Sequence, residues 1–175
     1  QSQMRINITM IGELDGQSSD RCMAIRTALE AGGISVQVVD NINVMMWEKF
    51  LGFACNATIA SLTRSRAGVI ARTIDGARFV SEVIGECAKV VTALGYPPLP
   101  AFNTAGIVAG VFFPPDSTYG PSLLIDMEEG RPTAGEQTGG DLAGRAGKAG
   151  LQPTLLTAAT CHLQASAIHR SNPHL

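Results

Sequence analysis

The hydrophobic residues of this chain change their period once, near residue 42, and that change limits what the chain can fold into. Before it, "RINITMI" (5–11) alternates apolar and polar side chains, which is typical of a strand with one face in water. From residue 42 onward the apolar residues recur at helical spacing. The sequence therefore predicts a mostly α fold in which a short section with strands comes first.

The section before residue 42 predicts a strand, a helix and a second strand. "GELDGQSSD" (12–20) is rich in turn residues, and Ser18 or Ser19 can cap the helix that follows. Two glycines at 32–33 end that helix, and "SVQVVD" (35–40) is the second strand. Since two strands and one helix are too few to be stable alone, this section is expected to be the tail of something larger.

Six helical segments are predicted after residue 41. The clearest is 76–94, where Asp75 can cap the first turn and Gly95 ends the last. The weakest is expected from after Pro132 to about Ala149, because it contains "GGDLAGRAGKAG" (139–150) and each interior glycine costs about 1 kcal/mol relative to alanine. The others are 42–63, an apolar segment ending at Phe113, one from Ser122 onward, and one from Pro153 to His169.

Charge, apolar runs and cysteine spacing argue against several kinds of partner. The net charge is −2 without a basic stripe, so nothing favours nucleic acid, and the longest central apolar run (105–113) is too short to span a membrane. Four well-separated cysteines predict buried free thiols in a reducing, cytoplasmic compartment. His162 and His169 are seven residues apart on one helix face, which is too little for a metal site, so no metal is expected.

Short nucleotide and hydrolase motifs are absent from the sequence. "GRAGKAG" (144–150) lacks both the glycine before and the Ser or Thr after the Gly-Lys pair that a phosphate-binding loop requires. No G-x-G-x-x-G follows a strand, and neither G-x-S-x-G nor H-E-x-x-H occurs. A function has to be argued from longer patterns.

Two longer stretches, taken together, resemble a known family. They are "WEKFLGFACNATIASLTRSRAG" (47–68) and "SLLIDMEEGRPT" (122–133), the second followed by "AGLQPTLLTAATCHL" (149–163). Their order and spacing are similar to the C-terminal helical domain of ketopantoate reductases (2-dehydropantoate 2-reductases) and looser relatives. "IGELDG" (11–16) resembles the end of that family's nucleotide-binding domain, so the resemblance covers nearly the whole chain.

The resemblance implies an NADPH-dependent oxidoreductase that reduces the ketone of a 2-keto acid to a 2-hydroxy acid, as in pantothenate biosynthesis. It implies that residues 1–41 are the tail of a truncated Rossmann (dinucleotide-binding) domain. Residues 42–175 would form an all-helical domain of the 6-phosphogluconate-dehydrogenase kind, which binds substrate and forms a homodimer. Because the phosphate-binding glycines are not in this sequence, the 175-residue chain alone is expected to be inactive.

Carried over residue by residue, the resemblance gives three candidate site residues. Lys49 matches the catalytic lysine, whose ammonium donates the proton that neutralises the alkoxide formed from the ketone. Ser122 matches a serine that hydrogen-bonds the substrate, and the alternative is a helix N-cap after Pro121. Arg131 is interpreted mainly as part of a solvated helix end and turn, with a contact to cofactor or substrate as the alternative.

The chain also departs from the family on the helix that carries Lys49. Phe53 and Ala57 stand four and eight residues after the lysine, where the family has asparagines. Asn56, seven residues after Lys49, returns to nearly the same helix face and is expected to replace them in part as a substrate ligand.

A further departure is Ala134, which stands where the family has a glutamate that holds the substrate hydroxyl and orients the lysine. Alanine cannot accept that hydrogen bond, and Glu136, two residues on, is expected to point away from the site. Two hypotheses stay open: an oxidoreductase of this family, and a catalytically silent helical module, derived from it, that dimerises or binds a partner. Other dehydrogenases with a Rossmann and a helical domain fit "WEK" and "GRPT" less well.

Overall fold

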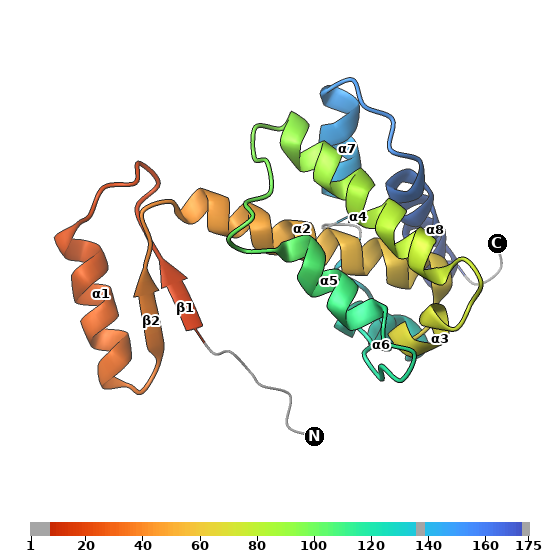
Figure 1. The fold of residues 1–175 in the computed structure, drawn as a ribbon, viewed down its shortest axis with the longest axis horizontal. Helices are drawn as coiled ribbons and strands as arrows, with labels where there is room; N and C mark the ends of the chain where they lie inside the picture. Colours follow the sequence, from red (N-terminus) through yellow and green to blue (C-terminus); the bar gives the residue numbers. More distant parts are fainter. Residues whose placement is uncertain (1–7, 136–138, 173–175) are drawn as a thin grey trace. The chain divides into compact units, whose positions relative to one another are not determined.

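The computed structural model describes residues 8–135 and 139–172, and the chain divides into two compact units, residues 1–47 and 48–175. The predicted fold class is confirmed: a β-α-β section with a small parallel sheet is followed by a helical section (Figure 1). The predicted domain boundary after residue 41 stays a prediction. The two compact units divide between Trp47 and Glu48, inside a single helix.

The first unit contains two parallel strands connected by a helix: β1 (Ile8–Ile11), α1 (Asp20–Ala31) and β2 (Ser35–Val38). Of the two predicted caps, Ser19 is the one used, since its hydroxyl accepts a hydrogen bond from the N–H of Cys22 at 3.1 Å. Gly33 has a φ of 80°, a left-handed conformation that glycine adopts without strain, and it turns the chain from α1 into β2.

The alternating pattern predicts that one face of β1 is in water, which implies that the opposite, apolar face is buried. That apolar face is exposed in the structure. Ile8 and Met10, which share a face, are 47% and 40% exposed. In the described part of this unit, the buried hydrophobic residues are Cys22 and Val36. The reason is size, because two strands and one helix bury little apolar surface. Residues 5–7 of the predicted strand lie outside the described residues.

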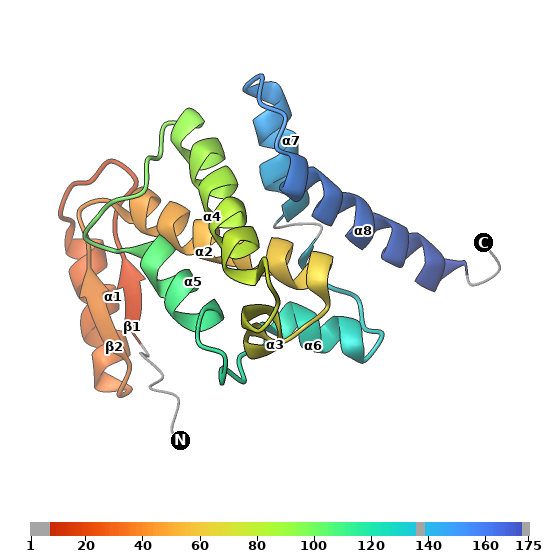
Figure 2. The ribbon, with the colours of Figure 1, turned by 45° about the vertical axis from the view of Figure 1, so that its right-hand side comes forward.

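The second unit is helical, and α2 leads into it from the first unit. Its helix α4 packs against α3, α5, α7 and α8. Figure 2 shows α8 leaving the other helices toward its C-terminal end, which agrees with the burial of only three of its residues. The helices are α2 (Ile42–Thr63), α3 (Ala67–Ala71), α4 (Gly76–Ala93), α5 (Thr104–Phe112), α6 (Ser122–Glu128), α7 (Asp141–Lys148) and α8 (Thr154–Ser171).

The core of the helical unit is built around the second half of α2, which is buried as its all-round apolar sequence predicts. One cluster joins α2 to α6 and α8 through small residues on α2 and larger ones on its neighbours. Its members are Ala57, Ala60, Leu123, Leu124, Met127 and Leu163. Small side chains on α2 let the other two helices approach closely, so this cluster fixes where α6 begins relative to α2.

Two predictions about single residues are wrong. Asp75 occupies the N-cap position of α4, but its side chain makes no capping hydrogen bond, and its carboxylate pairs with Arg78 at 3.0 Å instead. Cys161 is exposed on α8, whereas Cys22, Cys55 and Cys87 are buried, and all four thiols are free. Cys161 is not among the three residues through which α8 packs, which are Leu156, Ala159 and Leu163.

The glycine-rich stretch 139–150 contains the helix α7, so its glycines do not form a phosphate-binding loop. Leu142 and Ala146, one turn apart, are fully buried and hold α7 against the unit. Tertiary packing therefore overrides the low helix propensity of this segment.

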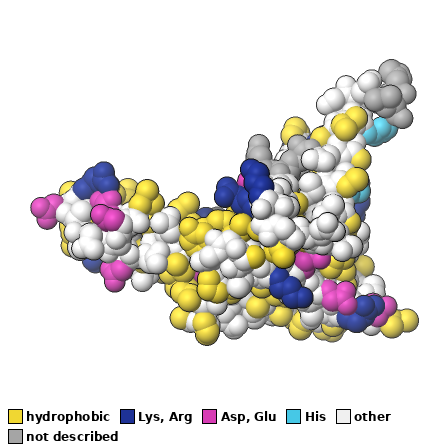
Figure 3. All heavy atoms as spheres, turned by 90° about the horizontal axis from the view of Figure 1, so that it is seen from above, with side chains coloured by type: hydrophobic (Ala, Val, Ile, Leu, Met, Phe, Trp, Pro, Cys, Tyr) yellow, Lys and Arg dark blue, Asp and Glu magenta, His cyan; other side chains and the backbone are white. Residues whose placement is uncertain are grey.

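The surface has no large region of a single charge on the face shown in Figure 3. Acidic and basic side chains are interspersed there with neutral and hydrophobic ones. Within the two described ranges, no helix is long and apolar enough to cross a membrane.

Candidate active site

Lys49 lies on the exposed side of α2, together with Phe53 one turn later. The Nζ atom of Lys49 is 5.6 Å from the centroid of the Phe53 ring, within the range of a cation–π interaction. Asn56 is half-buried and lies two turns after Lys49, so the two residues share nearly the same side of the helix. The structure thus brings Lys49 and Phe53 together and keeps Asn56 on their side.

The residue before Lys49 is a structural anchor that sequence reasoning missed. The side chain of Glu48 is buried, and its Oε1 atom accepts a hydrogen bond from the N–H of Leu99 at 2.5 Å. Its Oε2 atom accepts one from the hydroxyl of Thr104. These bonds offset the cost of burying a carboxylate and hold the start of α5 against the turn of α2 that carries Lys49. The sequence did contain a sign of this role, because Glu48 is the one acidic residue between Ile42 and Thr63, a segment that is otherwise mostly apolar.

Ser122 is the first residue of α6, and its side chain is exposed. Its alternative interpretation as an N-cap is wrong, since Pro121 occupies the cap position. The next residue, Leu123, packs in the core cluster with Ala57 and Ala60 of α2. Since Ala57 is eight residues beyond Lys49, about 12 Å along the helix axis, α6 begins beside a later part of α2 than the lysine.

Ala57 belongs to the core rather than to an exposed site. It is 5% exposed and lies in the cluster formed with α6 and α8. A larger polar side chain at this position would have to displace the neighbouring leucines. The absence of an asparagine here is therefore linked to how closely α2, α6 and α8 pack.

The Arg131 side chain forms ion pairs with carboxylates at the C-terminal end of α6, the helix that it follows. Its guanidinium pairs with Asp126 at 2.8 Å and with Glu129. The backbone N–H of Arg131 also bonds to the carbonyl of Asp126 at 2.8 Å, and that of Gly130 to the carbonyl of Met127 at 3.3 Å. This is a Schellman motif with Gly130 in the left-handed conformation, so the interpretation as a helix end and turn is confirmed.

Ala134, at the position of the family's glutamate, is exposed, while the following Gly135 is buried. A Cβ atom on Gly135 would lie 2.6 Å from side-chain carbons of both Leu123 and Leu163, so only glycine fits there without movement. This close packing fixes the backbone next to Ala134 against α6 and α8. Glu136, expected to point away from the site, lies outside the described residues.

A groove of about 550 Å³ lies elsewhere, between α4 and the start of α8. Neither Lys49 nor Ser122 lines it. Glu86 of α4 does, and its carboxylate accepts hydrogen bonds from the N–H groups of Thr154, Leu155 and Leu156 at 2.7–3.2 Å. Glu86 therefore caps α8 from a neighbouring helix, a role that sequence reasoning missed and assigned to no residue.

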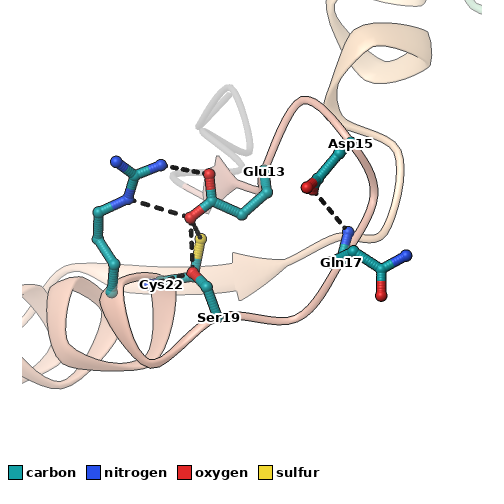
Figure 4. A network of polar contacts seen from close by, with 6 residues as sticks. Glu13, Asp15, Gln17, Ser19 and Cys22 are labelled. Carbon is teal, nitrogen blue, oxygen red and sulfur yellow. Dashed lines mark hydrogen bonds and ion pairs between the residues drawn. The ribbon is translucent and has the colours of Figure 1, made fainter.

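Polar contacts gather around Glu13 in the first unit, just after β1 (Figure 4). Its carboxylate accepts hydrogen bonds from the Arg21 guanidinium, from the Ser19 hydroxyl at 2.6 Å and from the Cys22 thiol at 3.6 Å. Bonding to Arg21 first, and to Ser19 next, lowers the pKa of Glu13 to about 2. The carboxylate thus stays ionised where the chain enters α1.

The cysteines and histidines do not assemble into a reactive centre or a metal site in the part of the chain that the structure describes. No group of three or more metal-ligating side chains occurs there. The Cys87 thiol, by hydrogen bonding, and burial together raise the pKa of Cys55 well above its ordinary value. The Cys55 thiol therefore stays protonated and unreactive.

Comparison with known proteins identifies the family of the helical unit. Residues 41–166 match the family described as the C-terminal domain of ketopantoate reductase PanE/ApbA. The match covers most of the chain and includes Lys49, Asn56, Ser122 and Arg131. The chain belongs to this ketopantoate reductase family, as the sequence resemblance indicated.

Among curated proteins, the chain is similar to the uncharacterized oxidoreductase YkpB of Bacillus subtilis, with 27% identity over 157 residues. That match covers 89% of this chain and 50% of YkpB, so the chain spans about half the length of the curated relative it matches.

Among solved structures, a dimeric ketopantoate reductase from Staphylococcus aureus matches with a TM-score of 0.77 and 18% identity, over 95% of this chain and 56% of that one. A 2-dehydropantoate 2-reductase from Methylococcus capsulatus matches with a TM-score of 0.74 and 24% identity, over 93% and 51%. A D-mandelate dehydrogenase with NADH and anilino(oxo)acetate matches with a TM-score of 0.76 and 16% identity, over 94% and 68%. At these identities the likeness shows a shared fold.

Proposed function

We propose that this chain supplies the proton-donating and substrate-binding part of a 2-dehydropantoate 2-reductase-like enzyme, which reduces the ketone of a 2-keto acid to a hydroxyl. The observation that carries the proposal is Lys49, an exposed ammonium on an ordered helix inside the region that matches the family. During reduction the ketone oxygen gains negative charge, and the ammonium of Lys49 donates the proton that neutralises it.

The exposed hydroxyl of Ser122 and the half-buried amide of Asn56 are the proposed ligands of the substrate. Both groups donate hydrogen bonds to a carboxylate. Arg131 is not assigned to the cofactor or to the substrate, since two carboxylates already pair with its guanidinium.

NADPH is the proposed cofactor by family, and it supplies hydride when bound. The described residues do not fit its phosphates. In dinucleotide-binding folds a glycine-rich turn after the first strand brings the phosphates to a helix N-terminus. The turn after β1, which resembles the end of such a domain and not its first turn, presents the Glu13 carboxylate, and this carboxylate, with a pKa of about 2, is ionised and repels phosphate. We therefore expect that the 175-residue chain by itself does not oxidise NADPH.

A homodimer and a cytoplasmic location complete the proposal. One similar solved structure is a dimeric ketopantoate reductase. The four cysteines are free thiols, which fits a reducing compartment.

A second candidate function is supported by Ala134, which is exposed at the position of the family's glutamate. Without a carboxylate there, nothing at this position orients the lysine or accepts the substrate hydroxyl. On this alternative the helical unit dimerises or binds a partner and performs no chemistry.

The test compares Lys49→Ala with Lys89→Ala in the polypeptide as its gene encodes it, using NADPH or NADH and a set of 2-keto acids. Lys89 is an exposed lysine on α4 and serves as the matched control. Lys49→Ala should lower kcat by about 100-fold or more while the dissociation constant of NADPH stays nearly unchanged. Lys89→Ala should have no effect on either quantity.

Equal turnover in the two variants would remove Lys49 from the mechanism. A wild-type protein that reduces none of the 2-keto acids, yet sediments as a dimer, would favour the silent module.

A further inference from the structure

An exposed aromatic ring stands beside the proposed proton donor. Phe53 is 52% exposed although it is among the largest apolar side chains of the unit. Its ring centroid is 5.6 Å from the Nζ atom of Lys49, so the ring and the ammonium form a pair on one side of α2. A molecule that contacts the ammonium from this side also comes within reach of the ring.

Two neighbours of this pair add carbon, and the amide of Asn56, on the same side of α2, lies one turn beyond Phe53. Gly52, one turn after Lys49, has no side chain, and a Cβ atom there would lie 3.6 Å from the methyl carbon of Thr104. The hydroxyl of Thr104 is turned to Glu48, to which it donates a hydrogen bond. Around Lys49, the side chain of Phe53 and the methyl group of Thr104 thus present carbon rather than hydrogen-bonding atoms.

We propose that Phe53 selects 2-keto acids whose side chain is apolar, in preference to those that carry a hydroxyl. The proposal rests on the proposed function, because it takes Lys49 Nζ as the atom that faces the ketone oxygen. That oxygen would lie about 3 Å from Nζ in a hydrogen bond. When the ketone approaches Nζ from the side of α2 that carries Phe53, the substituent on the ketone carbon comes within reach of the ring.

Two physical effects favour an apolar substituent at that place. A methyl or phenyl group that leaves water to contact the ring gains hydrophobic stabilisation. A hydroxyl placed there gives up its hydrogen bonds to water and finds no partner on a phenyl ring. A difference of one such group typically changes kcat/KM by about tenfold to a few hundredfold.

The experiment uses ketopantoate and trimethylpyruvate, which differ only by a hydroxyl in place of a hydrogen on the side chain. The ratio of their kcat/KM values is measured in the polypeptide as its gene encodes it, in the wild type and in Phe53→Asn and Phe53→Leu. Since both substrates depend on Lys49 in the same way, its contribution cancels in the ratio.

The wild type should favour trimethylpyruvate by about tenfold or more. Phe53→Asn, which offers an amide to the hydroxyl, should lower the ratio by about tenfold. Phe53→Leu, the matched control that stays apolar, should keep the preference. Phe53 is half exposed, so these substitutions are expected to leave the fold intact, which circular dichroism would verify.

A wild-type ratio near one, or one that favours ketopantoate through Asn56, overturns the inference while the proposed function stands. An unchanged ratio in Phe53→Asn also overturns it. If the wild type reduces neither substrate, the proposed function fails and the inference fails with it.

Discussion

The β-α-β unit and the helical unit of this chain are stabilised in different ways. In the first, burial is slight: Cys22 and Val36 are buried, whereas Ile8, Met10 and Ile25 are 40–47% exposed. Ionic and hydrogen-bonded contacts around Glu13 connect the end of β1 to the start of α1. In the second, large side chains such as Leu51, Ile59 and Phe112 are almost completely buried.

This difference in burial indicates that the helical unit, and not the β-α-β unit, can hold site residues in fixed positions. Hydrophobic stabilisation is roughly proportional to the apolar area removed from water, so the helical unit is stabilised by burial far more than the first unit is. Lys49 and Ser122 lie on helices whose opposite sides belong to that core. The buried carboxylate of Glu48 adds a fixed point directly beside Lys49.

The largest loss of stability should come from a substitution that leaves a cavity in the core of the helical unit at Phe112. Its side chain is 1% exposed and meets Tyr119 edge to face, with the ring centroids 5.7 Å apart. Phe112→Ala should lower the free energy of unfolding by about 3–5 kcal/mol. The matched control is Phe113→Ala, which removes the same group from a residue that is 43% exposed and should cost under about 1 kcal/mol.

Urea denaturation of the two variants measures this difference. Similar losses for the two substitutions would mean that the core of this unit does not lie where the structure places it.

An intermediate effect is expected at Glu86, where a polar contact supports the helical unit. Glu86→Ala leaves three N–H groups at the start of α8 without their acceptor and should cost about 1–3 kcal/mol. Glu82→Ala, one turn earlier on α4, removes only an exposed ion pair with Arg78 and should cost under about 1 kcal/mol. Hydrogen exchange of the α8 amides provides a local readout, and unchanged protection in Glu86→Ala would show that the carboxylate is not the cap.

The smallest effect should appear in the first unit and should depend on pH. Because the pKa of Glu13 is lowered from 4.5 to about 2 by Arg21 and Ser19, its contribution to stability is present above pH 4.5. It is lost as the pH falls from 4.5 toward 2. Glu13→Gln should therefore destabilise residues 8–38 at pH 7, and its difference from the wild type should shrink on acidification.

Thermal unfolding followed through the amide NMR signals of β2 checks this prediction. Glu30→Gln, which removes an exposed pair with Arg26, is the control and should change little at either pH. A Glu13→Gln effect that is the same at pH 7 and pH 2.5 would contradict the assignment of Glu13 as an ionised anchor.

Much of the fold was predictable because local patterns and tertiary packing agree. The helix 42–63 has the predicted bounds, since apolar residues on all its faces leave no alternative to burial. Ser19 caps α1 as predicted, because a serine before a helix satisfies a local N–H. Asp75 failed as a cap because Arg78 competes for the same carboxylate, which propensity alone does not reveal.

The site was predictable only in part. Lys49, Ser122 and the departures Phe53, Ala57 and Ala134 were found from motif spacing, and the family match confirms the resemblance that named them. The anchoring roles of Glu48 and Glu86 were missed. Each carboxylate bonds to atoms more than fifty residues away in sequence, and no local pattern encodes such a partner.

The sequence by itself determined the strands and the helices other than α3, and where the lysine, serine and alanine of the family pattern stand. Those are consequences of period, capping and spacing, which act over a few residues. Only the tertiary structure decided that Ala57 lies in the core and that Phe53 stays half exposed beside Lys49. It also decided that the Arg131 guanidinium pairs with Asp126 at the end of α6. Such outcomes depend on which surfaces meet when helices pack, and that is set by side chains far apart in the chain.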